Sequence, residues 1–165
     1  MATGATEITT PSDLSTTSEI ATGVAQFLSP VVRDLQALVV NGKQAHWHVR
    51  GASFAGIHEL LDDVVDHAQE AADTAAERIV ALGLPVDARI ETVAEQASLP
   101  QLADGFHGWE QTVAAVVGQL DAALVTVRAA VAGLDDVDLS SQDIAIAIEQ
   151  TLTKDRWLLQ AHVAS

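Results

Sequence analysis

The chain has 165 residues, enough for one domain with a buried core, and it has no cysteine, which excludes disulfides, cysteine-ligated zinc and iron–sulfur clusters. A formal net charge of −15 makes nucleic acid and anionic membranes poor electrostatic partners and makes cations the natural ligands. We find neither a signal-peptide pattern nor an apolar run of bilayer-spanning length, so we expect a protein of the reducing cytoplasm with no membrane partner.

The predicted elements begin after a polar N-terminal tail. Residues 1–18 are rich in Thr and Ser and contain no Lys or Arg, so we expect a mobile tail followed by one domain over residues 19–165. Ser29 and Pro30 are typical of an N-cap and a first helical position. Apolar residues then recur at helical spacing and predict a first helix that ends near His46.

Breaks in the helical periodicity mark three further long helices. Gly51 interrupts the chain after the first helix, and Ser53 can cap the second. The predicted ranges are 54–82, 102–131 and, capped by Ser140 or Ser141, a last helix ending near 164, with one short helix between residues 87 and 99. No segment shows the alternation of a strand. The pattern therefore predicts an all-α antiparallel four-helix bundle whose long crossover carries a short helix.

Two imidazoles and three carboxylates have the spacing of a metal site. His58 and Asp62 lie four residues apart on the second helix, and so do Asp73 and Glu77, so each pair projects from one helical face. His46 lies near the end of the first helix. This mixed set of nitrogen and oxygen donors suits ferrous iron, manganese or zinc.

The distance between the two pairs indicates that they serve different copies of the chain. Asp62 and Asp73 are three turns apart and nearly in phase, a separation of roughly 16 Å along a helix. One metal cannot bridge that gap, since ligand bonds are only about 2 Å long. A second copy of this helix, packed antiparallel across a two-fold axis, would bring the first pair of one chain (His58 and Asp62) against the second pair of the other chain (Asp73 and Glu77). The spacing therefore predicts a metal site shared between subunits.

The candidate ligands belong to a longer motif. It comprises the run KQAHWHVRG (residues 43–51), followed by Phe54, His58-Glu59, Asp62, Asp73 and Ala76-Glu77-Arg78. This motif resembles the Dps family of miniferritins, and the likeness extends from about Val31 to the C-terminus. The resemblance implies a ferritin-like bundle that assembles as a dodecameric hollow shell.

The resemblance also implies an activity. Fe(II) would bind His46, His58 and Asp62 of one subunit together with Asp73 and Glu77 of its mate, and a second iron could be bridged by the carboxylates. The family usually prefers hydrogen peroxide as the oxidant and stores ferric mineral inside the shell. We therefore expect an iron-storing ferroxidase that protects against oxidative stress.

Several neighbours of these ligands have two interpretations. Trp47 can pack against the bundle, and the resemblance suggests that it is also an oxidisable ring beside the iron. Lys43 and Arg78 would orient carboxylates across the subunit interface. The remaining acids either seed mineral or line pores, as the resemblance suggests, or are simply exposed to solvent; they are Glu59, Asp63, Asp66, Asp135, Asp136, Asp138 and Asp143.

Two other functions are compatible with the same features. A metal that lowers the pKa of bound water can hydrolyse an amide or ester, although no Gly-x-Ser-x-Gly motif supplies a nucleophile. DNA compaction, which some family members perform through lysine-rich tails, is disfavoured here because residues 1–18 lack Lys and Arg and the whole chain has only eight.

Overall fold

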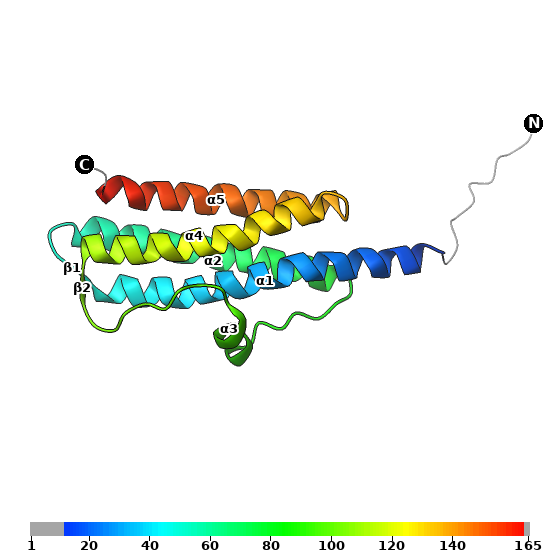
Figure 1. Cartoon of the computed structure of the whole chain (residues 1–165), viewed down its shortest axis with the longest axis horizontal. Coiled ribbons are helices and arrows are strands. Elements are labelled where there is room, and N and C mark those ends of the chain that lie inside the picture. Colours follow the sequence, from blue (N-terminus) through cyan, green and yellow to red (C-terminus); the bar gives the residue numbers. More distant parts are fainter. Residues whose placement is uncertain (1–11, 164–165) are drawn as a thin grey trace, which may run out of the picture.

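Four long helices pack side by side in the computed structural model, which describes residues 12–163 (Figure 1). They are α1 (Ser12–His48), α2 (Phe54–Ala81), α4 (Trp109–Leu134) and α5 (Leu139–Val163). The crossover from α2 to α4 carries the short helix α3 (Ile90–Gln96). The predicted all-α bundle with a short helix in its crossover is therefore confirmed.

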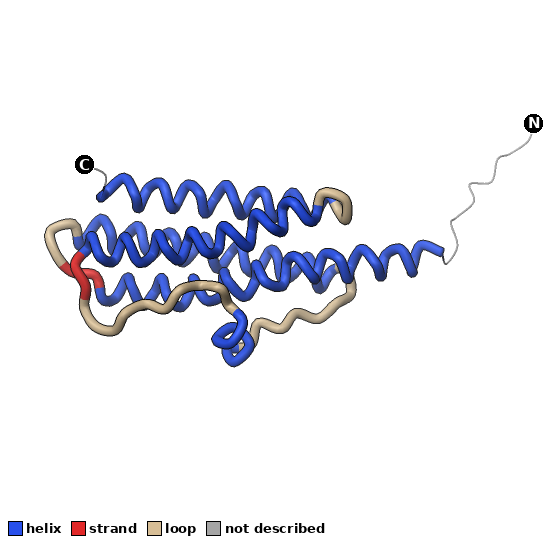
Figure 2. The backbone as a smooth tube through the Cα atoms, in the orientation of Figure 1, coloured by secondary structure: helices blue, strands red, loops and turns tan. Residues whose placement is uncertain are grey.

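The chain order places α1 against α2 and α4, and α5 against α2 and α4. α1 runs antiparallel to α2, and the crossover then returns the chain to the end where α2 began (Figure 2). There two short strands, β1 (Val49–Arg50) and β2 (His107–Gly108), pair in parallel. The sequence did not predict these strands, because two residues are too few to show an alternating pattern.

Apolar residues of all four long helices form one continuous core. Fully buried members include Leu35 of α1, Leu61 of α2, Leu120 of α4 and Leu152 of α5. A buried carboxylate, Asp34, joins three elements at the edge of this core. It accepts hydrogen bonds from the backbone N–H and hydroxyl of Ser98 in the crossover and from the hydroxyl of Thr126 in α4.

The prediction that the first helix begins at Pro30 is wrong, because α1 begins at Ser12 and continues through the proline. Upstream residues such as Val24 and Leu28 are fully buried. Their burial offsets the cost of an internal proline, about 3 kcal/mol. Residues 12–18 of the expected tail thus belong to α1, and residues 1–11 lie outside the described part of the chain.

The third long helix also begins later than predicted, at Trp109 instead of residue 102. Gly105 has a φ of 91°, a left-handed conformation that favours glycine and interrupts a helix, and β2 follows it. By length and composition α4 is long and apolar enough to cross a bilayer, contrary to the expectation from the sequence. Eleven of its residues are buried against its neighbours, as in the core helix of a bundle.

The expected helix caps are only partly correct. Ser53 occupies the N-cap position of α2, but its side chain makes no capping hydrogen bond. Asp138, not Ser140 or Ser141, caps α5: its carboxylate accepts a hydrogen bond from the Ser141 backbone N–H at 2.9 Å. Asp138, one of the acids for which the sequence leaves a pore or solvent exposure open, therefore holds the start of α5.

Candidate metal centre

The turn between α1 and α2 brings the end of one helix against the beginning of the other. Gly51 makes this turn possible with a φ of 111°. Gly42 allows α1 to approach α2 closely, since a Cβ at this position would lie 2.9 Å from a methyl group of Val65. Side chains near the end of α1 therefore face the first two turns of α2.

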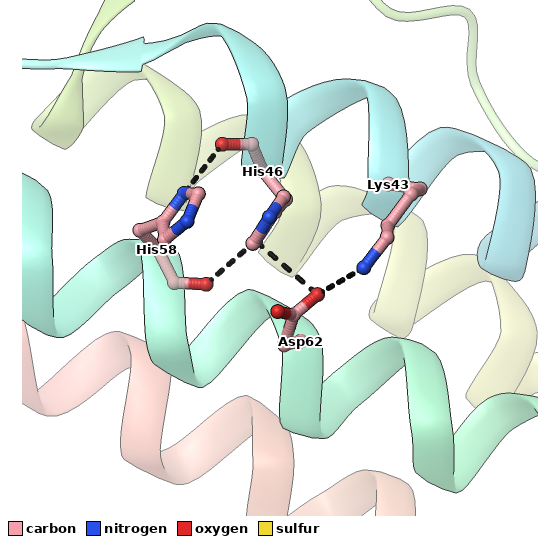
Figure 3. Close-up of polar contacts among 4 residues, drawn as sticks. All are labelled: Lys43, His46, His58 and Asp62. Carbon is pink, nitrogen blue, oxygen red and sulfur yellow. Dashed lines mark hydrogen bonds and ion pairs between the residues drawn. The ribbon is translucent and has the colours of Figure 1, made fainter.

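His46 and His58 meet in this contact and hold each other in place (Figure 3). The Nδ1 atom of His46 lies 2.8 Å from the carbonyl oxygen of His58, and Nδ1 of His58 lies 2.9 Å from the carbonyl oxygen of His46. The two rings stack with centroids 3.5 Å apart, and Phe54 packs against the His58 ring at 4.9 Å. The reciprocal bonds fix both ring orientations.

These bonds also define the tautomers. A carbonyl oxygen only accepts hydrogen bonds, so both Nδ1 atoms must carry a proton. In the neutral rings the lone pairs then lie on the Nε2 atoms, which make no hydrogen bond to the described residues. A histidine that donates its other N–H to a carbonyl is the usual arrangement of a metal ligand.

Asp62 lies one turn along α2 beside these rings. Its Oδ1 atom is 3.3 Å from Nδ1 of His46 and forms an ion pair with Lys43 (Figure 3). The hydrogen bond from Lys43 lowers the pKa of Asp62, and the charge of His46 adds to this effect. His46, His58 and Asp62 are thus brought together as the sequence predicted.

Asp73 and Glu77 lie farther along the same continuous helix, and both are exposed. Neither forms a hydrogen bond or ion pair within the described residues. Across residues 12–163, no three His, Asp or Glu side chains converge on a point that could hold a metal. Within one copy of the chain, the two groups of predicted ligands therefore stay apart, as the helical spacing requires.

Two residues expected near the ligands have different surroundings. Trp47 is 58% exposed, so the expectation that it packs against the bundle of its own chain is wrong. Arg78 is engaged within its own chain: its guanidinium donates hydrogen bonds to Asp138 at 2.8 Å and to the Ser141 hydroxyl at 2.9 Å. It therefore joins α2 to the start of α5.

Sequence reasoning did not find the reciprocal backbone bonds of the two histidines or a second histidine–carboxylate pair, His67 with Asp155. The first depends on the exact approach of α1 to α2. The second joins residues 88 positions apart. Neither arrangement has a local sequence signal.

A four-helix bundle with a helix in its crossover and a histidine–carboxylate cluster between its first two helices is characteristic of ferritin-like proteins. Comparison with known families agrees, since the ferritin-like domain matches residues 26–165. The DNA protection during starvation protein of Mycolicibacterium smegmatis is 31% identical over 149 residues, which cover 88% of this chain and 79% of that protein. The chain belongs to the Dps family of miniferritins.

Solved structures support the same assignment. The structure of Dps from Microbacterium arborescens in the high iron form has a TM-score of 0.87 and 60% identity, covering 89% of this chain and 96% of that one. Dps from Mycobacterium smegmatis gives a TM-score of 0.84 at 29% identity. Against a Deinococcus radiodurans relative, 29% identical, the match spans only 56% of that protein. Membership of this family supports iron binding and homo-oligomeric assembly.

Proposed function

We propose that this protein oxidises and stores iron at centres built by two subunits. The observation that carries the proposal is the mutual locking of His46 and His58, which leaves the Nε2 atoms of both rings without a hydrogen bond to the described residues, while the Asp62 carboxylate lies next to the His46 ring. Fe(II), the substrate, would bind these three side chains and the partner subunit's Asp73 and Glu77. The donor set of imidazoles and carboxylates suits ferrous iron.

Hydrogen peroxide is the proposed oxidant. Two Fe(II) ions at one centre, bridged by carboxylates, each give one electron to peroxide. The O–O bond breaks, two protons are taken up and two waters form. A single Fe(II) would supply only one electron and release a hydroxyl radical. Pairing the metals therefore protects the cell, and the exposed Trp47 ring would scavenge stray oxidising equivalents.

Lys43 and the exposed acids would govern how iron enters and leaves the centre. Lys43 holds Asp62 as an ion pair, so an arriving cation must displace the ammonium group. The net charge of −15 attracts cations over the whole surface. We propose that the subunits form a cytoplasmic dodecameric shell whose interior stores ferric mineral. The high iron form of the Microbacterium arborescens protein supports this role.

The charge arrangement favours protection through iron removal over direct coating of DNA. Five of the eight Lys and Arg residues form ion pairs with carboxylates within the described residues: Lys43, Arg78, Arg89, Arg128 and Arg156. Binding to DNA requires clustered cations that are free to release counterions from phosphates. The paired cations of this chain do not provide such a cluster.

The proposal is tested by following ferric absorbance after Fe(II) is added without oxygen and peroxide is then supplied. We expect rapid oxidation of Fe(II) in the wild type. In an Asp73→Ala/Glu77→Ala variant of preserved assembly, we expect Fe(II) to be oxidised only as fast as it is without protein. Thr74→Ala, a substitution of an exposed residue between the two acids, is the matched control and should retain the wild-type rate. Equal rates in wild type and double variant would contradict the assignment.

A further inference from the structure

A second oriented histidine lies on α2, away from the proposed iron centre. His67 Nδ1 is 3.0 Å from each carboxylate oxygen of Asp155 on α5. Along the helix, His67 is five residues beyond Asp62 and about 140° around the axis from it. The pair therefore lies on another face of α2, and the proposed oxidation of iron uses neither residue.

The burial of the two partners determines which ring nitrogen is accessible. The side chain of Asp155 is only 1% exposed, whereas that of His67 is 40% exposed. Because Nδ1 faces the buried carboxylate, Nε2 on the opposite side of the ring faces outward. His67 lines a groove between α2 and α5 together with Glu70, Thr74, Thr151 and Lys154. Within the described residues Nε2 makes no hydrogen bond.

The buried carboxylate prepares this nitrogen as a ligand. Burial raises the pKa of Asp155, and the hydrogen bond and charge of His67 oppose that rise. A more basic carboxylate holds the Nδ1 proton more firmly, which places the lone pair on Nε2 and makes it a stronger donor. Histidines that bind metals are commonly oriented by a carboxylate in this way.

Further oxygen donors lie on the same helical strip. Asp63 precedes His67 by four residues and Glu70 follows it by three, so both neighbour its ring on the helix surface. Both are exposed and free to turn. Asp66 adds a further negative charge beside them, while Lys154 of α5 is the cation that lines the groove. Since no three ligands converge in the described residues, one fixed imidazole would be completed by carboxylates that swing in from solvent.

We propose that His67, oriented by Asp155 and completed by Asp63 or Glu70, binds a divalent transition-metal ion in the groove between α2 and α5. An imidazole with carboxylate oxygens suits zinc, cobalt or ferrous iron. This site is separate from the shared centre and does not depend on the proposed function. The competing explanation is that the pair only clasps the two helices together.

Zinc titration of the assembled protein by calorimetry separates these explanations. In His67→Asn the amide can still donate to Asp155 from the position of Nδ1, but no nitrogen remains at the position of Nε2. We expect this variant to lose one zinc site per subunit while its unfolding transition stays close to that of the wild type. His162→Asn is the control: it removes an exposed histidine of α5 that has no orienting carboxylate within the described residues, and it should leave the titration unchanged.

Asp155→Asn tests the orienting carboxylate. Its amide can donate a hydrogen bond to Nδ1, which favours the tautomer with the ring proton on Nε2. Since Nε2 then has no lone pair for a metal, we expect the affinity for zinc to fall about 10- to 100-fold. Asp63→Asn/Glu70→Gln changes only exposed side chains and leaves the pair intact, so it provides a test even if the buried pair tolerates no change. We expect this variant to bind zinc more weakly.

The proposal is overturned if His67→Asn and Asp63→Asn/Glu70→Gln both bind as many zinc ions as the wild type, with equal affinity. The titration is then repeated in the Asp73→Ala/Glu77→Ala background, which lacks half of the shared centre. The site at His67 should persist there. Because the experiment measures zinc binding, the result at His67 does not depend on whether the protein oxidises iron.

Discussion

The two halves of the proposed iron centre both use residues of α2, with His46 of α1 added to one of them, yet the single chain fixes the two halves very differently. His46 is 6% exposed, and its ring and that of His58 are locked by each other's carbonyl groups. Asp73 and Glu77 are exposed and have no partner within the described residues. The nitrogen half is therefore formed when the chain folds, whereas in our proposal the carboxylate half would join a centre only when subunits assemble.

The largest expected effect compares removal of each half. His58→Ala and Asp73→Ala/Glu77→Ala should both slow the oxidation of Fe(II) by peroxide to the rate measured without protein. Their stabilities should differ. His58→Ala removes the ring N–H that donates to the His46 carbonyl oxygen, together with the stacked ring, and should lower the free energy of unfolding by about 1–3 kcal/mol. The double variant removes exposed groups, and we expect a change within about 0.5 kcal/mol.

Guanidinium denaturation at one protein concentration, paired with the oxidation assay, measures both effects. If Asp73→Ala/Glu77→Ala destabilised the protein as much as His58→Ala, the contrast between a folded half and an assembled half would be lost.

A smaller effect is expected at the other end of α2, where the structure assigns Asp138 to a helix cap. Asp138→Ala should lower the free energy of unfolding by about 1–2 kcal/mol and leave the initial rate of iron oxidation unchanged. Burial raises the pKa of Asp138, but the hydrogen bonds from Ser141 and Arg78 outweigh it and lower the pKa below 3.8. The stabilisation from the Asp138 carboxylate is therefore fully present above the pKa that this group has in the unfolded chain. It is lost as the pH falls through the lower pKa of the folded protein.

Chemical denaturation of Asp138→Ala and wild type at neutral pH and at decreasing acid pH tests this role. The difference between the two proteins should shrink in acid. A slower rate of iron uptake with unchanged stability would instead assign Asp138 to a pore.

Lys43 should have a weaker influence on the nitrogen half. In Lys43→Met the carboxylate of Asp62 no longer has to exchange an ammonium group for the metal. A partly exposed ion pair of this kind is worth up to about 1 kcal/mol, so zinc binding at the centre should tighten about twofold to fivefold. Calorimetric titration measures the change, and Arg89→Met, which breaks an ion pair elsewhere, is the control. Weaker binding would show that Lys43 orients Asp62 for the metal.

The smallest effect is expected with DNA. A gel-shift assay should show no complex at physiological salt. Lys43 and Arg78, which neighbour the proposed ligands, each form an ion pair with a carboxylate of the chain. A shift that weakens steeply with added salt would demonstrate phosphate contacts and contradict this expectation.

The same contrast explains what the sequence could predict. Spacing along one continuous helix placed His58 and Asp62 on one face and predicted a separate pair at Asp73 and Glu77. These predictions required only helical geometry. The approach of α1 to α2, which locks His46 against His58, depends on tertiary contacts and has no signature in the sequence.

The errors have physical causes too. Ser29 and Pro30 have the chemistry of a helix start, but core burial of upstream residues carries α1 through them. The pairing of His67 with Asp155 joins two helices that the sequence pattern alone could not align. Local chemistry therefore predicts elements and faces, while packing decides where helices begin and which polar groups meet.

The central claim, that each iron centre is shared by two subunits, is tested most directly by mixing two inactive variants. One lacks the nitrogen half (His58→Ala/Asp62→Ala), and the other lacks the carboxylate half (Asp73→Ala/Glu77→Ala). They are unfolded, mixed in equal amounts and reassembled. Half of the random dimers pair the two variants, and each such dimer has one intact centre of two, so about a quarter of wild-type oxidation should return. If the centre lay within one subunit, no activity would return, and the account would be contradicted.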